Sequence, residues 1–290
     1  MAEAQARDES GTGRESLYIV CGAQEIHVSA WGAPDAPVVM LWHGLARTGR
    51  DFDWVARSLA TRFRVYCPDQ IGRGLSQWSD DPSRDYRLAR YVEIAEQLAD
   101  ALGVACFSWL GTSMGGATSM LAAATRLKGR ISRLLINDIG PELPKPAVER
   151  IKAYAASPAP FERMSDFEAA IRRIYRPFGR HTDAQWRHLA ETSVRRQPNG
   201  SFTAHYDPRI VAQFDAAPPD YELWSAYDSL TLPTLVLRGA ESDLLLPAIA
   251  SEMKRRGPRP QMIDIEGCGH APGLNVETQI NIVLRFMTAG

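Results

Sequence analysis

One serine of this chain lies in a pattern that is typical of an exposed nucleophile. Ser113 is the centre of the sequence Gly111-Thr112-Ser113-Met114-Gly115, which has the form Gly-x-Ser-x-Gly. An apolar run over 107–110 precedes it and a helix-like stretch over 116–125 follows. A strand that turns sharply into a helix lifts the serine Oγ out of the sheet. Ser113 is therefore the leading candidate nucleophile, and a structural serine in a tight turn is the alternative.

A serine hydroxyl needs a base, and the base needs a carboxylate that fixes its tautomer. His270 follows Gly269 just beyond an apolar run near the C-terminus, and we expect it to be the base rather than a surface histidine. Asp243 follows the preceding run and is the acid that we favour. Asp138 is the second choice, and Glu241 is a further rival close to Asp243. The chain order is serine, acid, histidine.

These motifs together resemble the α/β-hydrolase fold superfamily, in particular a serine-nucleophile, esterase-like member with a helical cap. The resemblance covers about 17–287 and rests on motifs that occur in the family's order: His43-Gly44, 68–76, 111–115, 239–243 and 269–270. It implies an oxyanion hole built from the backbone N–H groups of Leu45 and Met114. It implies neither a cofactor nor a metal.

Four other side chains are candidates for substrate binding: His43, Arg47, Trp186 and Trp224. We interpret His43 as a structural residue near the site rather than as a second base. Arg47 could hold a substrate carboxylate, although a solvated turn is the interpretation that we favour, because exposed arginines are common. Asp69 and Arg73, in the glycine-rich turn over 68–76, are interpreted as turn and salt-bridge residues.

The elements that must position these groups alternate along the chain. Apolar β-type runs predict strands at 17–20, 26–31, 38–41, 64–67, 107–110, 134–136, 234–237 and 262–265. Helical spacing predicts helices at 51–60, 88–102, 116–125, 248–255 and 276–287. An opening hairpin followed by alternating strands and helices predicts an α/β fold with a mostly parallel central sheet and helices on both faces.

The segment 141–229 breaks this alternation. It shows helical stretches around 148–155, 166–175 and 183–195, several prolines, and no strong strand signal. We therefore expect a helical cap at 141–229, inserted after the sixth strand, and a core made of 17–140 and 230–290. The polar segment 1–16 is expected to be a mobile N-terminal tail.

Composition narrows the possible partners and compartments. The chain has 290 residues and a formal net charge of −1, which gives no basic excess for nucleic acid or an anionic membrane. It shows neither a signal-peptide pattern nor a long apolar span, so a cytoplasmic protein is expected. Its four cysteines lack CxxC spacing and are interpreted as buried reduced thiols. Cys268, two residues before His270, is a minor candidate nucleophile.

The expected activity follows from the nucleophile. A serine in the elbow favours attack on a carbonyl and an acyl-enzyme, whereas dehalogenases and epoxide hydrolases of this fold use aspartate. We expect a serine carboxylesterase acting on a small to medium carboxylic ester, hydroxyacid-type esters included. A carbon-carbon bond hydrolase of a ring-cleavage product is one alternative. A non-catalytic protein of the same fold that binds small molecules is the other.

Overall fold

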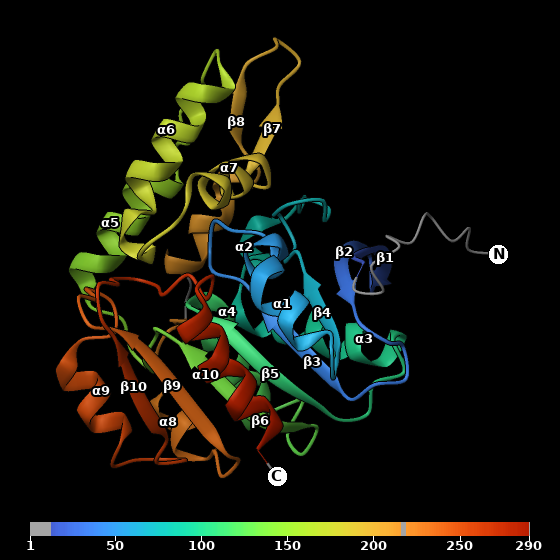
Figure 1. Ribbon diagram of the computed structural model, residues 1–290, viewed down its shortest axis with the longest axis vertical. Coiled ribbons are helices and arrows are strands. Elements are labelled where there is room, and N and C mark those ends of the chain that lie inside the picture. Colours follow the sequence, from blue (N-terminus) through green and yellow to red (C-terminus); the bar gives the residue numbers. More distant parts are fainter. Residues whose placement is uncertain (1–12, 216–218, 290) are drawn as a thin grey trace.

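The central feature of the fold is an eight-stranded sheet. The computed structural model describes residues 13–215 and 219–289. The strand order is β1-β2-β4-β3-β5-β6-β9-β10, with β1–β2 and β2–β4 antiparallel and all other pairs parallel (Figure 1). The strands are β1 (Glu15–Cys21), β2 (Gln24–Trp31), β3 (Val38–Trp42), β4 (Arg64–Pro68), β5 (Phe107–Thr112), β6 (Ile131–Asn137), β9 (Thr234–Gly239) and β10 (Gln261–Ile265). The predicted opening hairpin and mostly parallel sheet are confirmed.

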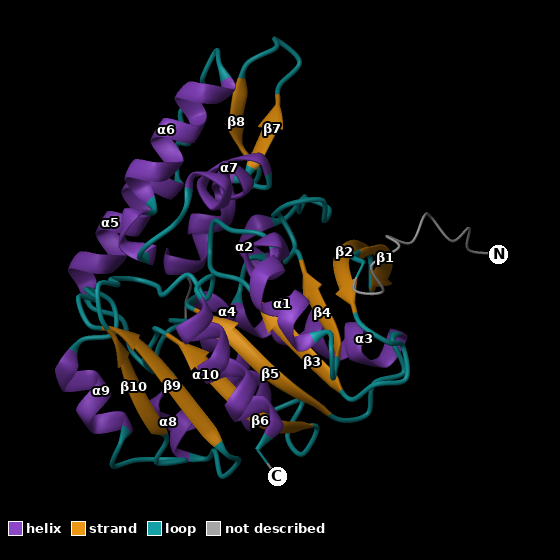
Figure 2. Cartoon of the chain, viewed as in Figure 1, coloured by secondary structure: helices purple, strands orange, loops and turns teal. Residues whose placement is uncertain are grey.

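Helices cover both faces of this sheet (Figure 2). The helices of the sheet region are α1 (Asp53–Leu59), α2 (Pro82–Asp85), α3 (Leu88–Ala101), α4 (Met114–Ala124), α8 (Trp224–Asp228), α9 (Pro247–Met253) and α10 (Glu277–Thr288), with a short 3-10 helix η1 (Gly49–Phe52) before α1. One buried cluster joins the sheet to α3, α4 and α9, and a second joins its other face to α1 and α10.

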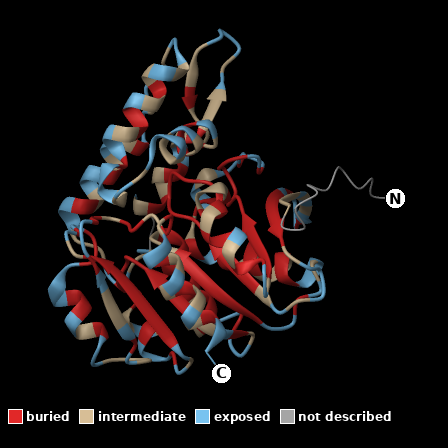
Figure 3. Ribbon diagram, viewed as in Figure 1, coloured by how far each residue is buried: buried red, intermediate tan, exposed pale blue. Residues whose placement is uncertain are grey.

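Successive strand residues alternate between these two clusters. Met40 and Trp42 of β3 point to the α3–α4 side, whereas Val39 and Leu41 point to the α1–α10 side. The Trp42 ring stacks on Trp109 of β5 with centroids 4.9 Å apart. Strands β4 and β9 are buried along their whole length, and β3, β5 and β6 along most of theirs (Figure 3), because helices remove both faces from water.

Most of the segment 141–229 lies outside the carboxyl ends of the central strands, whereas α8, near its end, packs against α4 (Figure 1). It contains α5 (Lys145–Ala155), α6 (Met164–Ile174), η2 (Arg176–Phe178), α7 (Asp183–Glu191), η3 (Pro208–Asp215), α8, and a two-stranded sheet of β7 (Val194–Arg196) and β8 (Phe202–Ala204). The expectation that this segment lacks strands is wrong. Asn199-Gly200, with Gly200 at φ 87°, is a hairpin turn signal that could have revealed the pair.

Main-chain hydrogen bonds join η2 to the loop that follows β10. The N–H of Gly269 donates to the carbonyl of Pro177 at 2.7 Å, and that of Gly273 donates to Phe178 at 3.0 Å. The two bonds lie on either side of His270, so the loop that carries this histidine is held by the inserted segment.

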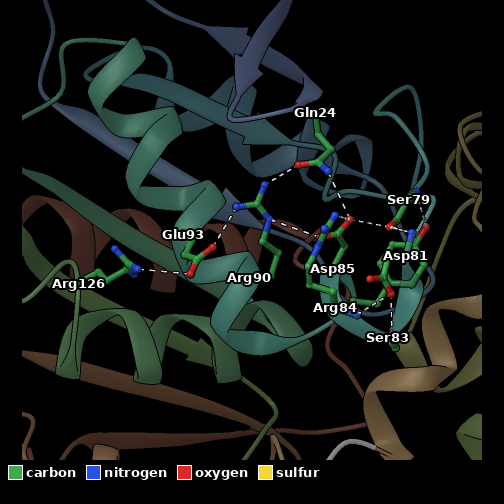
Figure 4. A network of polar contacts seen from close by, with 10 residues as sticks. Gln24, Ser79, Asp81, Ser83, Arg84, Asp85, Arg90, Glu93 and Arg126 are labelled. Carbon is green, nitrogen blue, oxygen red and sulfur yellow. Dashed lines mark hydrogen bonds and ion pairs between the residues drawn. The ribbon is translucent and has the colours of Figure 1, made fainter.

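A polar network connects the N-terminal hairpin to α2 and α3 (Figure 4). Asp85 is buried and accepts from Arg84, Ser79 and Gln24, while Arg90 links Gln24 to Glu93. The hydrogen bond from Arg84 lowers the pKa of Asp85. This network therefore fastens the N-terminal hairpin, at one edge of the sheet, to α2 and α3.

Strand β1 begins at Glu15, two residues inside the segment expected to be a tail, and residues 1–12 of that segment lie outside the described residues. Among the described residues, every helix is too short or too polar to cross a bilayer.

Candidate active site

Ser113 occupies the sharp turn between β5 and α4. Its backbone has φ 51° and ψ −119°, a region that residues other than glycine rarely adopt. Two glycines make the turn possible. A Cβ on Gly111 would lie 2.3 Å from the carbonyl oxygen of Gly115, and one on Gly115 would lie 2.1 Å from that of Trp42. The predicted nucleophile-elbow geometry is therefore present in the structure.

A hydrogen-bonded chain runs from Ser113 through His270 to Asp138. Ser113 Oγ lies 2.8 Å from His270 Nε2, and His270 Nδ1 lies 2.8 Å from Asp138 Oδ2. Asp138 follows β6 directly and is fully buried. Its carboxylate also accepts from the Gly239 N–H and the Ser242 hydroxyl, both at 2.7 Å. These donors hold the carboxylate in the orientation that an imidazole N–H requires.

Asp243, the favoured acid, does not reach His270. Its carboxylate pairs with Arg150 at 2.7 Å, and its side chain is 53% exposed. The expectation that Asp243 orients the imidazole is therefore wrong, and Asp138, the second choice, holds that position. Ser242, one residue earlier, turns inward to Asp138, which leaves Asp243 pointing toward α5. Glu241, the other rival, lines the same cavity as Ser113.

Two backbone N–H groups beside Ser113 have no acceptor within the part of the chain that the structure describes. They belong to Leu45, in the turn after β3, and Met114, the first residue of α4. A Cβ placed on Gly44 would lie 3.5 Å from Ser113 Cβ, so this turn passes directly beside the serine. Two free donors next to a serine are the arrangement that an oxyanion hole requires.

His43 holds the turn after β3 in place through hydrogen bonds of its ring. Its ring is fully buried, with Nδ1 2.7 Å from the Gly44 carbonyl and Nε2 2.9 Å from the Gln70 N–H. Because Nε2 accepts, the proton lies on Nδ1. Burial lowers the pKa of His43 to about 4, so the ring is neutral near pH 7. His43 lines a small cavity of about 30 Å³ that shares Gly44 and Thr112 with the larger cavity at Ser113, and its buried hydrogen bonds fit the expected structural role.

Ser113 and His270 open into a cavity of about 830 Å³. Side chains from α5, α6 and η2 form its far wall, and these include Tyr154, Ile174, Tyr175, Phe178, Arg150, Arg173 and Arg176. The lining is thus part aromatic and part cationic. A cavity of this size accommodates a small or medium-sized organic molecule.

The four predicted substrate-binding side chains are scattered. Arg47 lines this cavity, but it is only 4% exposed, so the favoured interpretation of a solvated turn is wrong. It pairs with Asp51 at 2.6 Å and lies over the Tyr175 ring. Burial opposes its charged form, yet Asp51 and Tyr175 hold the pKa of the guanidinium above its ordinary value.

Trp186 and Trp224 lie elsewhere. The Trp186 ring stacks on His181, at 4.3 Å between centroids. The Trp224 Nε1–H donates to Glu142 at 2.7 Å, and Arg256 lies over its ring. Neither tryptophan lines the cavity that Ser113 lines, so both predictions of substrate contact are wrong. Sequence alone does not show which side of an inserted helix faces the cleft.

Cys268, the minor candidate nucleophile, is buried. It accepts a hydrogen bond from the Gln279 amide at 3.6 Å and faces the carbonyl of Phe178. Burial raises the pKa of the Cys268 thiol, which disfavours the reactive thiolate. The arrangement favours a structural cysteine.

A second serine, histidine and aspartate set occurs at the sheet edge, and the sequence analysis missed it. Ser16 Oγ of β1 lies 2.6 Å from His27 Nε2, and His27 Nδ1 lies 2.8 Å from Asp69 Oδ2. Asp69 also accepts from the N–H groups of Gly49 and Leu75. His27 and Asp69 are buried, whereas Ser16 is exposed.

The fold and the serine-centred site define a class of protein, and comparisons of the whole chain agree with it. A sequence profile of the alpha/beta hydrolase family matches residues 38–278. The chain belongs to this family, as the sequence motifs predicted.

Individual relatives indicate which kinds of alpha/beta hydrolase the chain is similar to. The chain is 38% identical to a 3-hydroxybutyrate-oligomer hydrolase of Cupriavidus necator, over 92% of this chain and 94% of the relative. It is 33% identical to a 2-hydroxymuconate semialdehyde hydrolase of Pseudomonas putida, over 74% of this chain and 72% of that one. A crystal structure of an alpha/beta hydrolase from Novosphingobium aromaticivorans superposes with a TM-score of 0.85 at 32% identity, over 94% of this chain and 98% of the other. The chain is therefore an enzyme, a carboxylesterase-like hydrolase.

Proposed function

We propose that this protein is a serine carboxylesterase that hydrolyses small to medium carboxylic esters, esters of hydroxyacids among them, through an acyl-enzyme. The observation that carries the proposal is the continuous hydrogen-bonded chain from Ser113 through His270 to Asp138 at the wall of a large cavity. These are the nucleophile, base and acid that acyl transfer requires, in the geometry that it requires.

In the proposed mechanism, Ser113 Oγ attacks the ester carbonyl while His270 Nε2 accepts the hydroxyl proton. Asp138 accepts from His270 Nδ1 and stabilises the imidazolium that forms. The tetrahedral intermediate collapses, and His270 donates its proton to the leaving alcohol. Water then attacks the acyl-enzyme with the same imidazole as base, which releases the acid and restores Ser113.

The negative oxygen of each tetrahedral intermediate is stabilised by the N–H groups of Leu45 and Met114. Both donors come from backbone next to Ser113 and have no protein acceptor among the described residues. Such donors are worth about 10²–10³-fold in kcat each when they are held in place before the reaction begins.

The substrate class is inferred from the cavity and from one relative. Tyr154, Tyr175 and Phe178 offer apolar contact to an acyl or alkoxy group. We propose that 141–229 acts as a cap that supplies this wall. The similarity to a 3-hydroxybutyrate-oligomer hydrolase favours esters built from short hydroxyacids.

An ester panel tests the proposal. Wild type and Ser113→Ala are assayed on p-nitrophenyl esters of increasing acyl length, on 3-hydroxybutyrate dimer and trimer, and on a long-chain triglyceride emulsion. We expect multiple turnovers on short esters and on the oligomers, with nearly all activity lost in the variant. Highest activity on the triglyceride emulsion would contradict the proposed substrate class.

A carbon-carbon bond hydrolase is the second candidate, because the same site serves both reactions and one relative is a 2-hydroxymuconate semialdehyde hydrolase. Against it, the turn Gly44-Leu45-Ala46-Arg47 lacks the Ser-Gly-x-Gly form that such hydrolases often show. Loss of the visible absorbance of a ring-cleavage product, at a kcat/KM above that for any ester, would favour this candidate.

A further inference from the structure

Arg73 is a fully buried cation without a buried counter-ion. It lies in the turn between β4 and α2, and its exposed fraction is 0%. Within residues 13–215 and 219–289 no carboxylate forms an ion pair with it, so the expectation of a salt bridge is wrong for this residue. Burying an unpaired charge is costly. A fold that keeps such a charge must satisfy its donors in another way.

Two of these donors contact the residues of the proposed oxyanion hole. Arg73 Nε donates to the carbonyl oxygen of Leu45 at 2.8 Å, and Nη2 lies 3.4 Å from the Met114 sulfur. Leu45 belongs to the turn after β3 and Met114 to the start of α4. One guanidinium therefore contacts both residues of the proposed oxyanion hole, Leu45 through its carbonyl and Met114 through its side chain.

The remaining contacts hold the guanidinium itself in place. Nη1 donates to the carbonyl of Ile71 at 2.7 Å and to the hydroxyl of Tyr91, on α3, at 2.9 Å. The rings of Tyr86 and Tyr91 lie 5.5 and 5.2 Å from its central carbon. A planar group fixed on several sides holds the Leu45 carbonyl, which belongs to the 45–46 peptide, more firmly than the flexible ammonium of a lysine would. The Leu45 N–H belongs to the preceding peptide, so the constraint reaches it through the Leu45 Cα.

We propose that Arg73 is a positioning residue for the oxyanion hole, holding the turn at Leu45 beside Met114 and placing a positive charge next to both residues. The inference rests on the proposed function, because it concerns the same intermediate. Donors must lie within about 2.7–3.1 Å of the oxyanion, so a small shift of the Leu45 turn weakens one of them. A buried cation adds to the stabilisation, because charges interact strongly where water is excluded.

Arg73→Met and Arg73→Lys test this role, with Tyr227→Phe as the matched control. Methionine keeps most of the side-chain volume without the donors, and lysine keeps the charge without the planar fork. Tyr227 is fully buried and its hydroxyl donates to the carbonyl of Met253 at 3.0 Å, so Tyr227→Phe removes one buried hydrogen bond that involves none of Arg73, Leu45 and Met114. Circular dichroism and thermal unfolding establish that each variant is folded. The readouts are kcat and KM on p-nitrophenyl butyrate, and the Ki of a boronic acid that forms a tetrahedral adduct with Ser113.

We expect Arg73→Met to lower kcat about 10–10²-fold and to raise the boronate Ki by a similar factor, with KM within about threefold of wild type. Arg73→Lys should show a smaller change of both in the same direction. Tyr227→Phe should lower the melting temperature and leave kcat and Ki within about twofold.

Folded Arg73 variants with wild-type kcat and Ki would overturn the inference, as would a loss of kcat without a change in Ki. If Arg73→Met does not fold, Arg73→Lys decides by the same two readouts. Wild type that hydrolyses no ester and binds no boronate would contradict the proposed function, and this inference with it. An active wild type with unaffected variants contradicts the inference alone.

Discussion

The molecule contains two serine, histidine and aspartate sets with nearly the same hydrogen-bond lengths. At the elbow the serine to Nε2 and Nδ1 to carboxylate distances are both 2.8 Å, and at the sheet edge they are 2.6 and 2.8 Å. Hydrogen-bond geometry alone does not separate them. The surroundings of each serine do.

Ser113 and Ser16 differ in backbone and in environment. Ser113 lies at positive φ on a sharp turn, lines a cavity of about 830 Å³ and has beside it two N–H donors that find no acceptor among the described residues. Ser16 lies in a regular antiparallel strand, opposite Ser29, and is exposed. A serine paired with a histidine becomes an effective nucleophile only where a substrate can be held and its oxyanion stabilised. The set of Ser16, His27 and Asp69, called the edge set below, instead connects β1, β2 and the turn after β4.

Removing each serine hydroxyl should separate the two sets most clearly. We expect Ser113→Ala to lower kcat/KM for p-nitrophenyl butyrate by about 10⁴-fold or more. Ser16→Ala should change it by less than about twofold, because the edge set has no part in the reaction. Steady-state kinetics measures both. Similar losses in the two variants would mean that the edge set is also needed for catalysis.

The next largest difference in kcat is expected between variants of Asp138 and Asp243, the two candidates for the acid. Asp138→Asn should lower kcat about 10³–10⁴-fold, because an amide disturbs the tautomer that His270 needs. Asp243→Asn removes an exposed ion pair with Arg150 and should leave kcat within about twofold. Burst kinetics on folded protein compares them. A larger loss in Asp243→Asn would restore Asp243 as the acid and require a rearranged loop.

The edge set should affect stability instead of rate. Burial alone would raise the pKa of Asp69, but the hydrogen bond from His27 and nearby charges outweigh it and hold that pKa below its ordinary value. Its stabilising contribution is therefore complete above the unfolded pKa of about 4 and is lost as pH falls through the lower folded value.

Urea unfolding of wild type and Asp69→Asn at pH 7 and pH 3 checks this. We expect the variant to be less stable by about 2–4 kcal/mol at pH 7, because a buried acceptor of several donors is lost. The difference in free energy of unfolding between wild type and variant should be smaller at pH 3. A difference that is constant or grows toward acid pH would show that the Asp69 charge does not stabilise the fold.

Glycine substitutions should give the smallest effects, and these should be opposite in sign. Ser113→Gly relieves a positive φ and should raise the free energy of unfolding by about 1 kcal/mol while activity is lost. Ser16→Gly places glycine in a regular strand and should lower it by about 0.5–1 kcal/mol. Thermal unfolding monitored by circular dichroism measures both. Stabilisation by Ser16→Gly would indicate strain at the edge serine as well.

The sequence predicted most of the sheet, because buried parallel strands form continuous apolar runs such as 38–41. It also indicated that Ser113 and His270 belong together, because their motifs occur in a fixed order at strand ends. The acid was uncertain, because Asp138 and Asp243 both follow strands and only coordinates show which one turns inward. Arg73 resembled an ordinary turn residue, since nothing in the local sequence reveals that its partners are the carbonyl of Leu45 and a tyrosine on α3.

The hydrogen bonds on either side of His270 restrict how a ligand can be admitted. Because Gly269 and Gly273 donate to Pro177 and Phe178, a hinge motion that lifted η2 away from the sheet would carry the base out of register with Ser113. A motion confined to α5 and α6 would leave those bonds intact. Substrate that entered and product that left past α5 and α6 would therefore leave His270 in register with Ser113 between turnovers.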